Sequence, residues 1–289
     1  MIPIHGAKSN ALSWLKGRGA AGIEPETCFV FSEASFEPGL EELAEYVQSG
    51  TYISWLGGPG IDGVPWPTNA NGTALAHVAS FCLNEAQLHP EMAASWGPGL
   101  NLPDGYLEIY HDLETYGGSP EDRESQGWLV RYVEPRDGYG LVPPPGHSPD
   151  PVAGTECQLG LMMPGFTIPA YPDLEASGSV SVSFENWEEC LLELADVWHL
   201  QRFGKKAGYQ IPYTHLGGHS WDGKVEVADL LSEALPLGDG DEHLLLAVVE
   251  SWTTLNGWFG DAGNLEVWIR KSDLDSRAFS SAWCVIRTG

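Results

Sequence analysis

The chain has 289 residues, of which 43% are hydrophobic and 12 are tryptophan, so it can bury a large core. With 40 acidic and 14 basic residues the formal net charge is −26, which argues against nucleic acid and anionic membranes as partners, since both are bound through Lys and Arg. No apolar run reaches the roughly 20 residues of a membrane helix and no signal-peptide pattern opens the chain, so we expect a cytoplasmic protein.

Residues 1–50 are predicted to form an N-terminal helical extension. A short helical pattern at 10–16 is followed by a stronger one at 38–48. Pro38 suits the first turn of that helix and Gly50 follows its end, and both are typical positions for these residues.

The first half, residues 51–135, opens on Leu56-Gly57-Gly58, a paired glycine that indicates positive φ or close chain approach. Its apolar and alternating stretches predict strands, because side chains on a half-buried strand face the core at every second position. A helix that Pro90 would bend is predicted at 84–95. The predicted strands are residues 74–81, 105–111 and 128–133.

Residues 136–165 are predicted to be a connector between two halves. Pro143-Pro144-Pro145 and the prolines that follow leave few backbone donors for regular structure.

The second half, residues 166–289, repeats the turn as Leu216-Gly217-Gly218 and again continues towards an apolar strand. The longest helical pattern of the chain is at 186–202, where the apolar residues share one face. The other predicted elements are strands at 177–184, 244–250, 265–270 and 282–287, and helices at 225–234 and 273–277.

These elements predict an α+β fold: two related halves, packed as one unit, with mainly antiparallel sheets and flanking helices. Strands that follow one another through short loops favour antiparallel pairing, and the absence of regular βαβ alternation argues against a doubly wound sheet.

The second turn is the predicted location of any binding site. His215 and His219 have His-x3-His spacing, and acidic side chains follow them. The intervening Gly217-Gly218 favours a turn over a helix, and a metal site needs three or four convergent ligands, so we predict no metal. The candidate ligand-binding residues are His215, His219, Asp222, Trp258 and Asp261.

We assign no catalytic residue and expect no cofactor. Residues 58–63 match a three-glycine dinucleotide pattern, but prolines follow where a helix N-terminus would have to hold the phosphates. Asp261 between two glycines is typical of a tight turn, and no partner acid or base is identifiable by spacing. The five cysteines contain no Cys-x-x-Cys pair, so no zinc ribbon or dithiol site is expected.

The residues around both turns resemble the YwqG-like proteins, a bacterial family of unknown function. The resemblance covers roughly residues 52–289, through Leu56-Gly57-Gly58-Pro59, His215-Leu216-Gly217-Gly218 and the run from Trp258 to Gly263. It implies a turn-and-strand scaffold and brings no catalytic assignment. Similar proteins usually carry Gln in the apolar strand of each half, whereas this chain has Ser80 and Ala247 there, so an activity that depends on those glutamines would be changed.

Two functional hypotheses follow. The first is a non-enzymatic protein-binding role, in its sharpest form that of an immunity-type partner of a basic bacterial toxin, because an acidic surface attracts a basic protein. The alternative is an enzyme or small-ligand binder, with its site in the crevice between the halves near His215 and Asp261. A purely structural accessory role is not distinguishable from the first by sequence.

Overall fold

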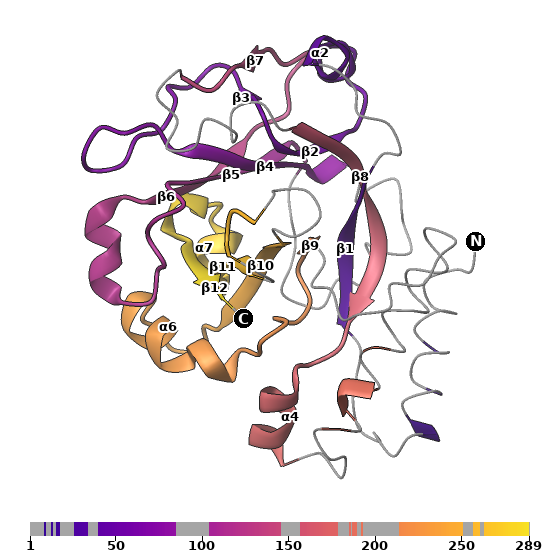
Figure 1. The fold of residues 1–289 in the computed structure, drawn as a ribbon, viewed down its shortest axis with the longest axis vertical. Helices are drawn as coiled ribbons and strands as arrows, with labels where there is room; N and C mark the ends of the chain where they lie inside the picture. Colours follow the sequence, from indigo (N-terminus) through magenta and orange to yellow (C-terminus); the bar gives the residue numbers. More distant parts are fainter. Residues whose placement is uncertain are drawn as a thin grey trace.

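A computed structural model describes residues 26–33, 40–84, 104–145, 157–178, 214–250, 257–260 and 263–288, with single positions between 9 and 17 and between 185 and 192. In this part of the chain the dominant feature is one ten-stranded sheet in which all neighbouring strands are antiparallel. Figure 1 shows the sheet curling round until its two ends approach each other, which makes it nearly closed and barrel-like.

The strands fall into two matching sets and a central pair. The first set is β2 (Ser54–Gly57), β4 (Ala76–Cys82), β5 (Tyr106–His111) and β6 (Trp128–Val133). The second set is β9 (His215–Leu216), β10 (His243–Glu250), β11 (Asn264–Arg270) and β12 (Trp283–Arg287). Between them lie β1 (Glu26–Glu33) and β8 (Cys157–Thr167), and a separate two-stranded sheet joins β3 (Gly60–Ile61) to β7 (Leu141–Val142).

The spatial order of the strands is β12-β11-β10-β9-β1-β8-β2-β4-β5-β6. Read outward from the central pair, β9 matches β2, β10 matches β4, β11 matches β5 and β12 matches β6. The whole of β1 pairs with residues 160–167 of β8, with Ser32 opposite Leu161. The strand β1 also pairs with β9, so it borders the second set. The strand β8 pairs with β2, so it borders the first set.

The helices of the described residues are short. They are α2 (Leu40–Gln48), α4 (Tyr171–Ser177), α6 (Ala228–Ala234) and α7 (Lys271–Asp275), with the 3-10 segments η2 (Pro120–Ser125), η3 (Val225–Val227) and η4 (Phe279–Ser281). The predicted helices at 38–48, 225–234 and 273–277 are confirmed as α2, η3–α6 and α7 within a few residues. So are the six strands predicted at 74–81, 105–111, 128–133, 244–250, 265–270 and 282–287.

The predicted α+β class, with separate sheets and flanking helices, is wrong. Two strands that the local pattern did not indicate, β1 and β8, lie in the centre and join both sets into a single sheet. The strand β1 belongs to the segment predicted as a helical extension, and β8 begins in the segment predicted as a connector. Residue 177, the predicted start of a strand, is the last residue of α4.

Several predicted elements cannot be compared. The helices predicted at 10–16, 84–95 and 186–202, and the strand at 177–184 beyond its first residues, lie outside the described residues apart from single positions. Among the described residues no helix is both long and apolar enough to cross a membrane.

The two ends of the sheet meet through side chains and one loop. The indoles of Trp128 in β6 and Trp283 in β12 pack edge to face with centroids 4.8 Å apart. The loop after β5 then runs along β12, where Ile286 N–H donates to Tyr116 O at 2.8 Å. Trp283 Nε1 donates to Gly117 O, also at 2.8 Å. These contacts cover the edge of β12, which would otherwise offer unpaired backbone groups.

Apolar residues fill both sides of the sheet. The largest cluster joins side chains from both strand sets, among them Val78, Leu107, Leu246 and Val267, and all four are fully buried. On the outer side, α2 covers the first set through Leu43, which belongs to a second cluster. A third cluster places α6 against β10, β11 and β12. The sheet therefore separates one shared interior from two outer layers.

Each Leu-Gly-Gly turn packs against the central pair. A Cβ added to Gly58 would lie 2.8 Å from Cys157 Cβ, and one added to Gly218 would lie 3.1 Å from Cys28 Cβ. Both glycines also have positive φ, at 68° and 80°. The turns need glycine because the chain reverses where it touches a neighbouring strand.

Candidate functional site

Two buried glutamates occupy matching positions in the two strand sets. Glu108 of β5 lies opposite Ser80 of β4, and Glu266 of β11 lies opposite Val248 of β10. Both residues are 0% exposed. Burial of a carboxylate is costly unless donors or a cation compensate it, so the surroundings of each glutamate define the main polar site of its set.

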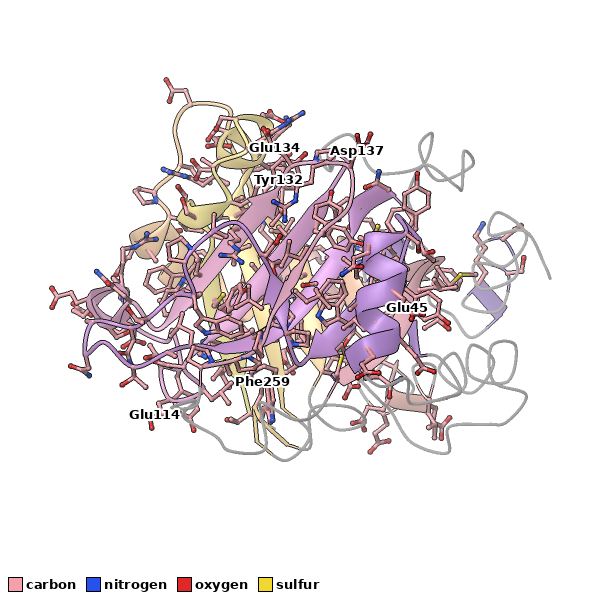
Figure 2. The ribbon with its side chains drawn as sticks, turned by 90° about the horizontal axis from the view of Figure 1, so that it is seen from above. Glu45, Glu114, Tyr132, Glu134, Asp137 and Phe259 are labelled. Carbon is pink, nitrogen blue, oxygen red and sulfur yellow. The ribbon has the colours of Figure 1, made fainter. Side chains whose placement is uncertain are left out.

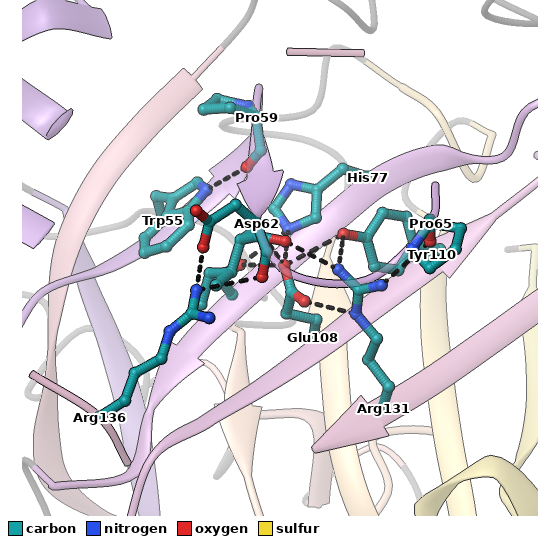
Figure 3. A network of polar contacts seen from close by, with 11 residues as sticks. Trp55, Pro59, Asp62, Pro65, His77, Glu108, Tyr110, Arg131 and Arg136 are labelled. Carbon is teal, nitrogen blue, oxygen red and sulfur yellow. Dashed lines mark hydrogen bonds and ion pairs between the residues drawn. The ribbon is translucent and has the colours of Figure 1, made fainter. Parts of the chain in front are cut away.

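Glu108 accepts hydrogen bonds from three different segments, and Ser80 of a fourth lies beside it (Figure 3). Its Oε1 accepts the backbone N–H of Ile61 at 2.8 Å and the hydroxyl of Tyr110 at 3.1 Å. Its Oε2 accepts Arg131 Nε at 2.6 Å, and Ser80 Oγ lies 3.3 Å from Oε1. The carboxylate is therefore both hydrogen-bonded and paired with a cation in the adjacent strand.

Arg131 ties the loop after the first Leu-Gly-Gly turn to the sheet. Its Nη2 donates to Ile61 O at 3.1 Å and to the Tyr110 hydroxyl at 2.9 Å. The guanidinium also lies over the Tyr110 ring, 4.9 Å from the centroid. A Cβ on Gly60 would overlap the Tyr110 hydroxyl, so the loop can approach only as glycine. The side chain of Arg131 is 13% exposed and marks the outer limit of the network.

A serine–histidine contact lies within this network. His77 Nδ1 is 2.9 Å from Gly57 O, which can only accept, so Nε2 is free to accept the Ser80 hydroxyl at 2.8 Å. Burial lowers the pKa of His77, which keeps the imidazole neutral. This resembles the nucleophile–base pair of hydrolases. Ser80 is 0% exposed, however, so the pair cannot meet a substrate in this conformation, and we assign it a structural role.

Glu266 has fewer partners. Its Oε1 accepts the Ser220 hydroxyl, and its Oε2 accepts Trp268 Nε1 at 3.0 Å. The residue opposite it in β12 is Val285, whereas the residue opposite Glu108 in β6 is Arg131. The second set thus repeats the glutamate and its link to the loop after Leu-Gly-Gly, but not the direct cation.

The nearest arginine of the second set serves another carboxylate. Arg287 Nε lies 3.3 Å from Asp222 Oδ2, on the loop that carries Ser220. The amide of Asn264 reaches the same Asp222 oxygen at 3.4 Å, and its own Oδ1 is buried with no hydrogen-bond partner in the described structure.

The two predicted site histidines near the second turn make different contacts. His215 in β9 is buried, and its Nδ1–H donates to Gly217 O at 2.7 Å. Burial lowers its pKa to about 4, so the ring is neutral near pH 7. His219 instead approaches Thr167 Oγ1 at 3.2 Å and Glu26 Oε2 at 3.5 Å, and so joins the turn to the ends of β8 and β1.

The remaining predicted residues do not complete a site. Asp222 binds Arg287 as described, and Trp258 is partly buried against the shared interior cluster. Asp261 lies outside the described residues. In the ranges that the structure describes, no group of three or more His, Cys, Asp or Glu side chains is arranged to hold a metal ion.

Sequence reasoning missed Glu108, Arg131 and Glu266. A signal was present, because Leu107-Glu108-Ile109-Tyr110 and Leu265-Glu266-Val267-Trp268 share one pattern of apolar, acidic, apolar and aromatic residues. In both copies the aromatic side chain donates to the glutamate two positions before it.

The strand pairing also corrects the expected correspondence of Ser80 and Ala247. Ala247 lies opposite Leu216, as Ala79 lies opposite Leu56. The counterpart of Ser80 is therefore Val248, and the counterpart of Ala247 is Ala79. The two residues expected to replace family glutamines, Ser80 and Ala247, do not occupy matching positions.

Comparison with known proteins gives one family match. No curated protein matches the chain. One family model, described as a domain of unknown function (DUF1963), matches residues 55–287, from β2 to the end of β12. This match includes both Leu-Gly-Gly turns, both buried glutamates and the greater part of the chain. The chain belongs to the DUF1963 family.

Proposed function

We propose that the protein is a non-enzymatic, cytoplasmic protein-binding module whose partner is basic. The observation that supports this proposal is the charge of −26, much of it on exposed side chains. A field of this sign accelerates encounters with a positively charged protein and repels nucleic acid.

Exposed acids gather where η2 and α6 lie side by side (Figure 1). On η3–α6 the exposed residues Glu226, Asp229 and Glu233 are spaced by three and four, which places them on one helical face. The neighbouring η2 adds the exposed Glu121 and Glu124. We call these five residues the acidic face.

Nearby cations are engaged with the protein itself. Arg123 of η2 lies over the Trp283 ring, 5.0 Å from its centroid, and Lys224 Nζ donates to His243 O at 2.7 Å. Neither is directed at the five carboxylates by these contacts. The acidic face is therefore a suitable surface for Lys and Arg side chains of a partner.

The sharper form of the proposal is that of an immunity-type partner of a basic toxin. Its support is the resemblance to the YwqG-like proteins and their association with toxin-bearing gene neighbourhoods, together with the acidic face. This support is by analogy, since one fold can carry many functions.

The test reverses charges on this protein and measures its binding to a partner that has been captured from the source cells, identified and purified. The variant Glu226→Lys/Asp229→Lys/Glu233→Lys is expected to weaken binding roughly 100-fold, at about 1 kcal/mol for each reversed contact. The matched control reverses the three exposed glutamates of α2, Glu41→Lys/Glu42→Lys/Glu45→Lys, and changes net charge equally. Figure 2 shows Glu45 on α2, at the outside of the molecule.

The control separates a local surface from net charge. We expect the α2 variant to bind within roughly threefold of the wild type, and wild-type binding to weaken steeply with added salt. Equal losses in both variants would show that only total charge matters. A captured partner that is acidic, or whose binding does not respond to salt, would contradict the proposal itself.

A further inference from the structure

The second buried glutamate lacks the compensation that the first one has. Glu108 accepts Arg131 Nε at 2.6 Å, whereas Glu266 faces Val285 at the matching position. Glu266 accepts hydrogen bonds from Ser220 and Trp268, both uncharged. Among the described residues, a negative charge on Glu266 is therefore buried without a directly bound cation, which is costly.

The charged groups around Glu266 in the described part of the chain do not supply a directly bound cation either. Asp222, from the loop between β9 and η3, disfavours a negative charge, and Arg287 of β12 favours it from a position where it is bound to Asp222. Across the sheet, Glu266 lies opposite Val248 of β10, and Val248 lies opposite His215 of β9. Burial keeps His215 neutral near pH 7. On the side of α4, Asp173 is engaged by the backbone amides that begin η3.

Glu266 is one of several attachments of residues 217–224. The others include Gly217 N–H to Leu246 O, His219 N–H to Thr167 Oγ1 and Asp222 to Arg287. Glu266 binds the Ser220 hydroxyl, and Ser220 Oγ in turn accepts the N–H of Gly223 at 3.0 Å. The next two amides, of Lys224 and Val225, bind the Asp173 carboxylate at 3.0 and 2.8 Å. Between the second Leu-Gly-Gly turn and η3, Ser220 thus joins the segment to the sheet through this one carboxyl group.

We propose that Glu266 is a proton-sensitive anchor, which holds Ser220 and the turn to Gly223 against β11 while its carboxyl is neutral and favours release of this turn when it loses its proton. The hydrogen bond between Oε1 and Ser220 Oγ reverses on protonation: the ionised carboxylate accepts the Ser220 hydroxyl, and the neutral carboxyl donates its proton to Ser220 Oγ while Oε2 still accepts Trp268 Nε1. On ionisation the proton passes to solvent and leaves a buried anion that is stabilised when water reaches it. Release of the turn provides that water.

The electrostatic environment of Glu266 agrees with this geometry. Burial raises the pKa of the Glu266 carboxyl from 4.5 to about 6, although Ser220, Arg287 and Trp268 each lower it. Between these two values the folded protein binds more protons than the unfolded chain, so its stability falls as pH rises through this window. Above about pH 6 the penalty is fully present.

The experiment compares the unfolding equilibrium of the full chain with that of Glu266→Gln between pH 4 and 7.5. Gln can donate to Ser220 Oγ and accept from Trp268, as the neutral carboxyl does. Relative to the wild type, the folded-to-unfolded ratio of the variant is expected to rise by about 30-fold across this range, the ratio that corresponds to the pKa change from 4.5 to about 6. Buried histidines are present in both proteins, so their contribution to the pH dependence of unfolding cancels in the comparison.

A second readout needs no variant. Amide exchange of Gly223, corrected for intrinsic rates, is expected to lose protection above about pH 6. The amide of Ile61, which is held by the cation-paired Glu108, serves as the internal control and keeps its protection. A wild-type-to-variant ratio that does not change with pH, or equal pH responses of Gly223 and Ile61, would overturn the proposal. Neither measurement requires a binding partner, so both are independent of the proposed function.

Discussion

Glu108→Gln is expected to destabilise the protein by about 3 kcal/mol, the lower end of the range for breaking a buried ion pair, because Arg131 is partly accessible to water. The amide would place an N–H group against Arg131 Nε or against the Ile61 N–H, since both carboxylate oxygens accept hydrogen bonds. The measurement is the free energy of unfolding in urea at pH 7.

A double substitution tests the cause of this loss. If the cost comes from an uncompensated Arg131, then Glu108→Gln/Arg131→Met should be less destabilised than Glu108→Gln alone. Glu266→Gln is the matched control in the other strand set and is expected to shift stability in the opposite direction at pH 7. Equal destabilisation by the two Glu→Gln substitutions would contradict the difference between the two sites.

Gly117→Ala is expected to cost about 3 kcal/mol through positive φ and overpacking, because a Cβ at this position would overlap the Cys284 carbonyl oxygen of β12. Gly117 has φ of 67° and lies in the loop that brings the end of the first strand set onto the edge of the second. The neighbouring Gly118→Ala is the control, because no heavy atom lies within 4 Å of its added Cβ.

The comparison of these two alanines by thermal or urea unfolding tests closure of the sheet. Gly118→Ala should remain within roughly 0.5 kcal/mol of the wild type, as is usual for surface substitutions. If Gly117→Ala is equally neutral, the loop does not pack against β12 as described.

The outer strands were predictable because their local pattern is regular. In β5 and β11 apolar residues alternate with polar ones, and the stretches end at short polar loops. The two Leu-Gly-Gly turns lie at the first strands, β2 and β9, of two matching strand sets on either side of the central pair.

The central pair was not predictable from local pattern. Residues 28–31 of β1 form a short apolar run without alternation, and β8 contains Gly160, Met162 and Pro164. Their pairing joins segments far apart in the chain, as Ser32 and Leu161 show, and no local periodicity encodes such contacts. The fold class was wrong because these two strands decide whether there is one sheet or two.

The polar sites escaped prediction for a related reason. Glu108 and Glu266 appear on the outer side of their strands, where acidic residues are normally solvated. Their burial depends on the loops after the Leu-Gly-Gly turns folding back over the sheet, with Ile61 and Ser220 as the contacts. The role of those turns is therefore to direct each loop onto a glutamate.

The central claim is that β1 and β8 join the two strand sets into one sheet. Amide hydrogen exchange under native conditions tests it most directly, because amides of a central strand open only with global unfolding. We expect residues 28–31 of β1 to exchange with the same opening free energy as the central amides of β4 and β10. Rapid exchange of residues 28–31 while β4 and β10 remain protected would contradict the claim and would show that β1 is a peripheral extension.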